Sequence, residues 1–233
     1  MSQSPPTETT EACVKVKKGT EFGFRPTWTS KNRETVSLAR VANKIRLKPG
    51  FHLLLARNGR GKTTFLKTVA GCLAPLAGDI NVTGQVQYLS EDLKFDPELT
   101  PRRILNSLFD KELLEVAGQL ASRLELPEKN TYETLSKGNR QKLSIIISET
   151  MAASAGPQVL LMDEPFSGVD FHIREEIGKI WNECERKHIR VICLHPDEPT
   201  LKADGALVIT DNELNWRPVD GSLDWLSLKP ELN

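Results

Sequence analysis

The sequence predicts an α/β fold built on a mainly parallel sheet, and three observations support this class. Apolar runs typical of buried strands recur along the chain, at Phe51 to Ala56, Val159 to Met162, Val191 to Leu194 and Ala206 to Ile209. Amphipathic helical stretches lie between these runs, which is the pattern of parallel strands joined by helices. The 233 residues also suffice for one large domain without disulfide or metal staples.

The N-terminal part predicts a tail followed by short antiparallel strands. Residues 1–12 are rich in Ser, Thr, Pro and Glu and lack the basic and apolar segments of a secretory signal, so we expect a disordered tail. The segment that follows alternates valine with lysine and then carries Phe22, Phe24 and Trp28 between turn residues. This pattern favours strands over a helix.

The middle of the chain changes from strands to helices. Ile80 to Val82 and Val86 to Leu89, separated by Thr83-Gly84, predict a hairpin. Over about residues 91–151 the apolar residues recur mostly at helical spacing, so we expect a helical subdomain there. We place it within one domain over 13–215 and assign 216–233 to a C-terminal extension without recognisable chemistry.

Composition and charge narrow the classes of partner. Lys plus Arg and Asp plus Glu both number 31, so the formal net charge is zero and no nucleic acid partner is expected. The four cysteines are scattered without a CxxC pair, which fits reduced thiols in a cytosol better than a metal site. No apolar stretch approaches the roughly 20 residues of a membrane-spanning helix.

A phosphate-binding loop, called the P-loop below, is predicted over residues 56–64, between a buried strand and an amphipathic helix. Its glycines, Gly59 and Gly61, allow successive backbone N–H groups to converge on phosphate oxygens, and the following helix directs its positive N-terminus at the same anion. We expect Lys62 to hold the β and γ phosphates and Thr63 to bind Mg²⁺. Further contacts are assigned to the remaining polar members of the loop, Asn58, Arg60 and Thr64.

The first P-loop position carries Ala56 in place of the usual glycine. If that position needs a positive φ, alanine costs about 1 kcal/mol and slackens the loop. The alternative for the whole segment is a glycine-bearing surface turn before a helix.

A second candidate element is the apolar strand that ends in Asp163-Glu164. We expect Asp163 to bind Mg²⁺ through water and Glu164 to polarise a water that attacks the γ-phosphate. Taken alone, such a strand is often only a strand that meets a polar loop. Its position about 100 residues after a P-loop favours the catalytic interpretation.

Together these segments make the chain resemble the ABC family of ATPases, over roughly Val14 to Ile209. The run from Leu135 to Gln141, LSKGNRQ, is similar to the LSGGQ signature that opens a helix. The resemblance implies that Ser136 and Gly138 contact the γ-phosphate of ATP bound to the opposite subunit. The alternative is a helix cap, for which Ser136 and Asn139 are both suited.

Four further residues are assigned by the resemblance. Asp170, in Ser167-Gly168-Val169-Asp170, corresponds to the family's D-loop and is expected to face the dimer partner, with an N-cap as the alternative. His195 follows an apolar strand, as the family's switch histidine does. Glu91 occupies the place of a metal-sensing glutamine, and Trp28 is preferred over Phe22 and Phe24 as the ring that stacks on adenine.

The resemblance implies a P-loop NTPase fold and an ATP-binding, ATP-hydrolysing subunit of an ABC transporter. The expected cofactors are ATP and Mg²⁺, and the expected partners are a second ABC ATPase subunit, favoured as a homodimer over a heterodimer, and integral membrane permease subunits. We expect it in the cytoplasm, peripheral on the cytoplasmic face of the inner (plasma) membrane. The substrate and direction of transport are not encoded in these motifs.

Two alternatives to the transporter subunit stay open. One is a soluble ABC ATPase in cofactor assembly, since the chain has a single cassette and no coiled-coil insertion. The other is a regulatory ATP-binding module with weak turnover, suggested by the unusual Ala56, Glu91 and Lys137. The retained Lys62 and Glu164 favour hydrolysis.

Overall fold

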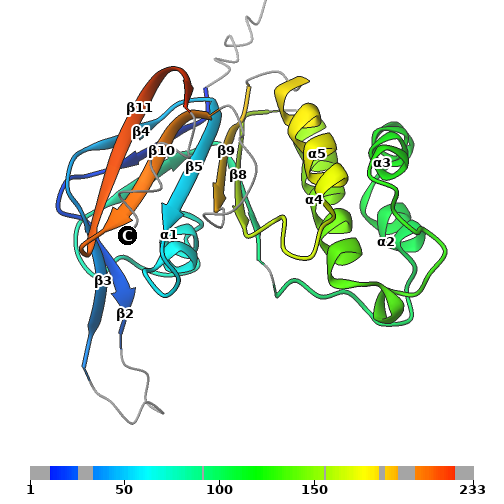
Figure 1. Ribbon diagram of the computed structural model, residues 1–233, viewed down its shortest axis with the longest axis horizontal. Helices are drawn as coiled ribbons and strands as arrows, with labels where there is room; N and C mark the ends of the chain where they lie inside the picture. The colour runs from blue at the N-terminus through cyan, green and yellow to red at the C-terminus, as the bar shows by residue number, and fades with distance from the viewer. Residues whose placement is uncertain are drawn as a thin grey trace, which may run out of the picture.

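Two β-sheets and five α-helices make up the part of the chain that the structure describes (Figure 1). The structure is a computed structural model. It describes residues 11–25, 34–90, 92–154, 156–183, 187–193 and 203–223, the last six of these in backbone only.

The larger sheet has eight strands in the order β2-β3-β11-β10-β5-β9-β8-β7. Its strands are β2 (Glu21–Phe24), β3 (Val36–Val41), β5 (Gly50–Ala56), β7 (Gln85–Leu89), β8 (Gln158–Asp163), β9 (Ile189–Cys193), β10 (Ala203–Thr210) and β11 (Glu213–Leu223). The five neighbours from β7 to β10 are all parallel, which confirms the predicted α/β class with a mainly parallel sheet. Their apolar sequences fit burial on both faces.

The smaller sheet is antiparallel and has the order β4-β1-β6, formed by β1 (Cys13–Val16), β4 (Ile45–Leu47) and β6 (Ile80–Thr83). The predicted hairpin between β6 and β7 is wrong. β6 pairs with β1, whereas β7 joins the larger sheet beside β8. Gly84, at φ 109° between them, allows the chain to leave one sheet and enter the other.

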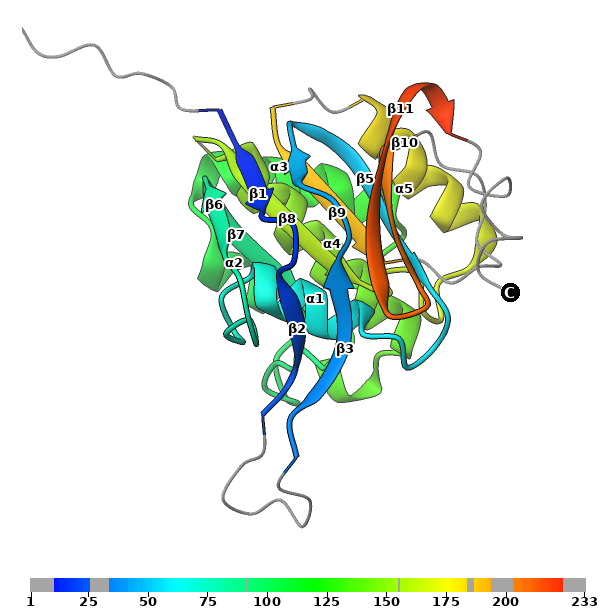
Figure 2. The same cartoon turned by 90° about the vertical axis from the view of Figure 1, so that its left-hand side faces the viewer.

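Helices cover the two faces of the larger sheet unequally (Figures 1 and 2). The helix α1 (Lys62–Val69) packs with the smaller sheet on one face. On the other face lie α4 (Lys137–Ala153) and α5 (Phe171–Glu183), with α2 (Pro101–Leu108) and α3 (Lys111–Arg123) outside α4. None of the described helices is long and apolar enough to cross a bilayer.

The C-terminal strand β11 extends the larger sheet. It pairs antiparallel with β10, where Trp216 is the partner of Leu207, and parallel with β3. The Trp216 ring also meets His52 edge-on, with 5.3 Å between ring centroids. The strand therefore crosses residue 216, where the sequence placed the start of an extension.

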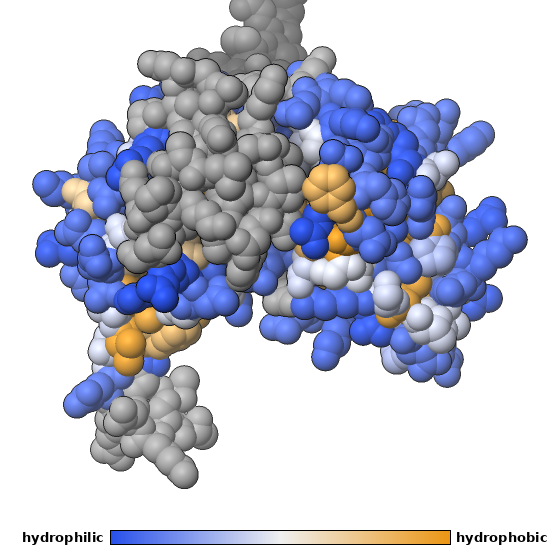
Figure 3. Space-filling model, viewed as in Figure 1, coloured by the Kyte–Doolittle hydropathy of each residue, from blue (hydrophilic) through white to orange (hydrophobic). Residues whose placement is uncertain are grey.

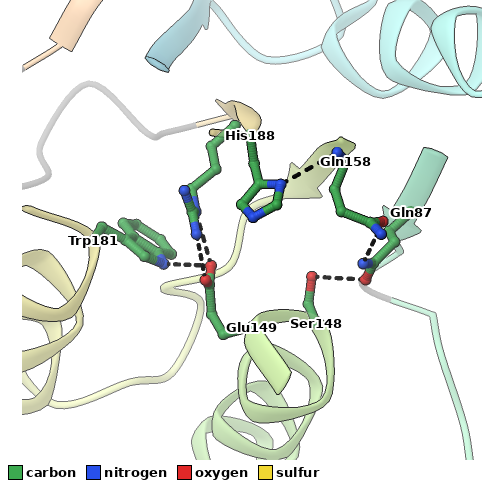
Figure 4. A network of polar contacts seen from close by, with 7 residues as sticks. Gln87, Ser148, Glu149, Gln158, Trp181 and His188 are labelled. Carbon is green, nitrogen blue, oxygen red and sulfur yellow. Dashed lines mark hydrogen bonds and ion pairs between the residues drawn. The ribbon is translucent and has the colours of Figure 1, made fainter. Parts of the chain in front are cut away.

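A buried polar network joins α4 to the larger sheet (Figure 4). The Glu149 carboxylate of α4 accepts hydrogen bonds from Trp181 Nε1 at 2.8 Å and from Arg190 at 2.6 and 3.1 Å. Both charged side chains are almost fully buried, at 6% exposure for Arg190 and 3% for Glu149. The contacts satisfy each charge and fix α4 against β9 and α5.

The residue of α4 that precedes Glu149 is Ser148, which extends the polar contacts toward the edge of the sheet. Its hydroxyl donates to Gln87 Oε1 at 3.2 Å, and Gln87 donates to Gln158 at 3.2 Å. The backbone N–H of Gln158 donates to His188 Nδ1 at 3.2 Å. Three neighbouring strands and α4 are thus connected by buried hydrogen bonds, which specify their relative positions.

Replacing Glu149 tests the importance of the buried ion pair. Because Glu149→Ala leaves Arg190 charged and buried, we expect a loss of about 3–5 kcal/mol in the free energy of unfolding. The measurement is chemical denaturation followed by circular dichroism. The matched control is Asp79→Ala, which removes the exposed ion pair with Lys17 and should cost less than about 1 kcal/mol. Equal losses for both variants would contradict the assignment.

Candidate functional site

The P-loop lies between β5 and α1, where its two glycines adopt left-handed backbone conformations. Gly59 has φ 76° and Gly61, the N-cap of α1, has φ 95°. A Cβ at Gly61 would also lie 3.1 Å from Leu38 and 3.2 Å from Phe22. Both the backbone angle and the close approach therefore require glycine at position 61.

Ala56 occupies an ordinary strand position, so the positive φ under which alanine would slacken the loop is not required here. The residue ends β5, pairs with Ile209 of β10 and is not among the residues with positive φ. Its side chain is buried in the sheet core. Alanine therefore carries no backbone strain at this position.

Lys62 begins α1 and folds back over the loop. Its Nζ donates to the carbonyl oxygen of Ala56 at 3.2 Å and to Asn58 Oδ1 at 3.5 Å. The residue is 6% exposed, yet its ammonium group has only these two long contacts among those the structure describes. An anion above the loop would supply a stronger partner for it.

A hollow of about 550 Å³ opens above the P-loop. Its polar lining comes from the loop, the start of α1 and Glu164 after β8, and its apolar lining comes from the β2–β3 pair. The lining residues are Phe24, Leu38, Asn58, Gly59, Gly61, Lys62, Thr63, Thr64 and Glu164. Its volume and mixed lining are typical of small-molecule sites.

The apolar part of the hollow is exposed to solvent. Phe24 is 51% exposed and the nearby Val36 is 49% exposed, and Figure 3 shows an apolar patch over this end of β2 and β3. Phe22, another of the aromatic candidates, is instead fully buried against Phe65. Phe24 is therefore the described aromatic residue that lines the hollow.

Asp163 and Glu164 lie at the end of β8 that faces the P-loop. The strand register aligns Asp163 with Cys193 of β9, and Cys193 with Leu54 of β5. Glu164 reaches the hollow from a left-handed backbone conformation, with φ 47°. A non-glycine residue at such an angle stores backbone strain, a feature that clusters at functional sites.

The charges of this region surround the buried thiol of Cys193. Burial raises the pKa of the thiol, and the Asp163 carboxylate raises it further, whereas the Lys62 ammonium lowers it. Glu164 adds a smaller upward effect. Lys62 therefore acts on the same thiol as Asp163 and Glu164, although about 100 residues separate it from them.

Asp163 has a neighbour that the sequence did not identify. The Tyr88 hydroxyl of β7 lies 3.4 Å from Asp163 Oδ2. Burial raises the pKa of Tyr88, and the charge of Asp163 raises it further, so the hydroxyl keeps its proton and donates. The sequence motifs give Tyr88 no role, and only the register of β7 beside β8 brings it to Asp163.

The oxygen atoms near the loop fit a magnesium ion. Thr63 lines the hollow and Asp163 is 7% exposed beside it, so a hydroxyl and a carboxylate oxygen are available at one edge of the sheet. Mg²⁺ prefers such hard oxygen ligands together with substrate phosphates and water. These two residues would hold the metal.

The segment that resembles the signature caps α4. Ser136 Oγ accepts the N–H of Asn139 at 3.2 Å, so the capping alternative is observed in this structure. A Cβ at Gly138 would overlap the carbonyl oxygen of Gly168. The turn around Ser136 to Gly138, called the signature turn below, therefore packs directly on the segment that leads to Asp170. The carbonyl oxygen of Asp170 accepts the first backbone hydrogen bonds of α5.

The structure groups some of the predicted residues and separates others. The hollow contains Asn58, Gly59, Gly61, Lys62, Thr63, Thr64 and Glu164. Arg60 instead directs its guanidinium to Asn212, at 3.4 Å. Ser136, Gly138 and Asp170 do not line the hollow, because α4 and α5 lie on the opposite face of the sheet from α1. Trp28, Glu91 and His195 lie outside the described residues.

Comparison with known proteins decides the family. The family model of the ABC transporter matches residues 44–167, which is more than half of the chain. The chain belongs to the ABC transporter family. It carries the ATP-binding domain of that family, as the resemblance predicted.

Two relatives share about a third of their aligned residues with this ABC domain. One is an uncharacterised ABC transporter ATP-binding protein of Methanocaldococcus jannaschii, 31% identical over 50% of this chain and 46% of its own. The other is the ABC transporter ATP-binding protein YtrB of Bacillus subtilis, which is 30% identical over 53% of this chain and 46% of its own. The chain thus spans about half the length of the curated relatives it matches.

Solved structures show the same fold. An ATP-binding cassette solved as a dimer in a post-hydrolysis state, bound to ADP and phosphate, gives a TM-score of 0.69 at 18% identity, over 89% of this chain and 99% of its own. An ABC transporter of metal-chelate type, solved in an inward-facing conformation, gives a TM-score of 0.65 at 16% identity. The match covers 89% of this chain and 83% of that structure. At these identities the likeness concerns the fold alone.

The contact between Gly138 and Gly168 can be tested by adding one methyl group. Gly138→Ala places a Cβ against the Gly168 carbonyl oxygen, so we expect a loss of about 1–3 kcal/mol in the free energy of unfolding. The matched control is Gly118→Ala in α3, where nothing lies within 4 Å of the new Cβ. Because alanine favours helix, the control should gain up to about 1 kcal/mol. Chemical denaturation of both variants decides, and a stable Gly138→Ala protein would refute the contact.

Proposed function

We propose that this ABC domain binds Mg-ATP in the hollow above the P-loop and hydrolyses it. The observation that carries the proposal is the position of Glu164, which lines the same hollow as Lys62 and Thr63 although about 100 residues separate them. A phosphate-binding loop and a candidate general base are thus directed at one volume. That arrangement suits transfer of a phosphoryl group to water.

Several groups support binding of the triphosphate. The first N–H groups of α1 have no partner within the helix, and the helix dipole makes this end attractive to anions. Lys62 adds a full positive charge, and Gly59 and Gly61 let the backbone approach closely. The exposed ring of Phe24 and the side chain of Leu38 provide an apolar surface for the base.

The reaction requires a water molecule in line with the γ-phosphate. Glu164 orients this water and takes its proton as the new P–O bond forms and the bond to ADP breaks. Lys62 stabilises the negative charge on the phosphoryl oxygens. A magnesium ion held by Thr63 and Asp163 would neutralise further charge between the β and γ phosphates.

The proposed site is completed by a second subunit. Ser136 and Gly138 begin α4 on the face away from the hollow, so the same chain does not present them to its own nucleotide. A second copy could bring its α4 N-terminus to the γ-phosphate, and Asp170 to the facing surface. The dimeric form of the structurally similar cassette supports this assembly.

Coupling to membrane subunits is the transporter-specific part of the proposal. The names of the relatives and the fold of an intact ABC transporter support it. A soluble ATPase is the second candidate. The Escherichia coli protein YheS, whose name gives ATP binding and no transport, is 27% identical over 79% of this chain and 30% of its own length. Co-purification of an integral membrane protein from detergent extracts supports the transporter, and recovery without one supports the soluble candidate.

Two substitutions separate binding from turnover. We expect Lys62→Ala to abolish measurable ATP binding, because the phosphates lose their cation. We expect Glu164→Gln to bind ATP normally and to lower the rate of phosphate release by a factor of about 10² to 10⁴. Calorimetry and a phosphate assay measure the two quantities, with Lys67→Ala in the same helix as control. Unchanged turnover in Glu164→Gln would refute the proposed hydrolysis.

The contribution of the Phe24 ring can be measured separately. Because stacking of an aromatic side chain on a base is worth about 1–3 kcal/mol, Phe24→Ala should weaken ATP binding by a factor of about 5 to 150. The binding of inorganic triphosphate, which has no base, should not change. Leu108→Ala is the control, since Leu108 has a similar exposure of 49% but lies on α2. An equal effect on ATP and triphosphate would contradict the assignment.

A further inference from the structure

Tyr88 and Asp163 lie on neighbouring parallel strands and on the same face of the sheet. The partner of Tyr88 in β8 is Leu161, and Asp163 follows Leu161 by two residues. Because side chains alternate between faces along a strand, Leu161 and Asp163 point to the same side. Tyr88 packs against the core cluster that contains Leu161, and its hydroxyl reaches Asp163 Oδ2 at 3.4 Å.

The adjacent residue of β7 makes its polar contact on the opposite face. Gln87 is directed to Ser148 of α4, at 3.2 Å (Figure 4). A shift of β7 by one residue would turn both side chains to the opposite faces and would therefore break both contacts at once. The network around Gln87 fixes the register that brings Tyr88 to Asp163.

We propose that Tyr88 is a positioning residue for the metal-binding carboxylate of Asp163. This inference rests on the proposed binding of Mg-ATP. With Oδ2 occupied by the tyrosine hydroxyl, the orientation of the carboxylate is fixed and its other oxygen is available to the metal or to its water. Partners that orient a metal-binding carboxylate in this way typically change metal affinity by a factor of about 10 to 100 when removed.

The contact is suited to such a role rather than to holding the fold together. Its length of 3.4 Å exceeds the roughly 2.5–2.7 Å of a strong bond between a hydroxyl and a carboxylate. A contact of this length contributes little to the free energy of unfolding, while it still directs Oδ2 of Asp163 toward the tyrosine hydroxyl. Removing the hydroxyl oxygen leaves the tyrosine ring, and hence the packing against the core, in place.

The experiment compares the two tyrosines of the chain in a Glu164→Gln background, which prevents turnover. Affinity for ATP is measured by calorimetry with EDTA and with excess Mg²⁺, and the ratio gives the contribution of the metal. Tyr88→Phe and Tyr132→Phe each remove one hydroxyl. The hydroxyl of Tyr132 donates to the Leu93 carbonyl oxygen at 3.0 Å, and this residue does not line the hollow.

We expect Tyr88→Phe to reduce the Mg²⁺-dependent gain in affinity about tenfold while affinity in EDTA stays unchanged. Tyr132→Phe should change neither value. Equal behaviour of the two tyrosine variants would overturn the inference, as would a loss of affinity in EDTA by Tyr88→Phe. If the parent protein bound no ATP with or without Mg²⁺, the proposed function would fail and this inference with it.

Discussion

The common register of the parallel strands β5, β9 and β8 is the constraint on which the candidate site depends. It brings Leu54, Cys193 and Asp163 to one level of the sheet, so the P-loop after β5 and the carboxylates after β8 open at the same edge. Ligands of open α/β sheets bind beyond the carboxyl ends of the strands for this reason. A slip of one strand by one residue would turn its polar end residue to the other face.

Buried polar contacts make this register specific. Apolar strands such as β8 and β9 could slide past one another with little change in hydrophobic burial, whereas Gln87, Gln158 and Glu149 each find partners in one arrangement only. The ion pair also holds the C-terminal half of α4 against the sheet. The opposite end of this helix carries Ser136, so the position of the signature turn is set from about ten residues away.

Much of the fold and of the site could be predicted from local sequence. The apolar runs predicted the parallel strands, and the spacing of Gly59, Gly61 and Lys62 predicted the loop and the helix that follows it. What sequence could not provide depends on which strands become neighbours. The prediction of a hairpin after Ile80 was wrong because β6 and β7 enter different sheets. The role of Tyr88 was missed because its contact with Asp163 exists only across the β7–β8 pair. Whether Ala56 strains the loop was also left open by the sequence, because its backbone angle is set by the strand and not by the motif.

The left-handed backbone of Glu164 also bears on how this protein tolerates change. Glycine adopts φ 47° without the penalty of about 1–2 kcal/mol that an L side chain meets there. Selection for thermal robustness alone would thus favour losing the carboxylate at this position. The chain therefore keeps its proposed general base in opposition to its own conformational preference, and the proposed function would make this a trade of stability for activity at a single residue.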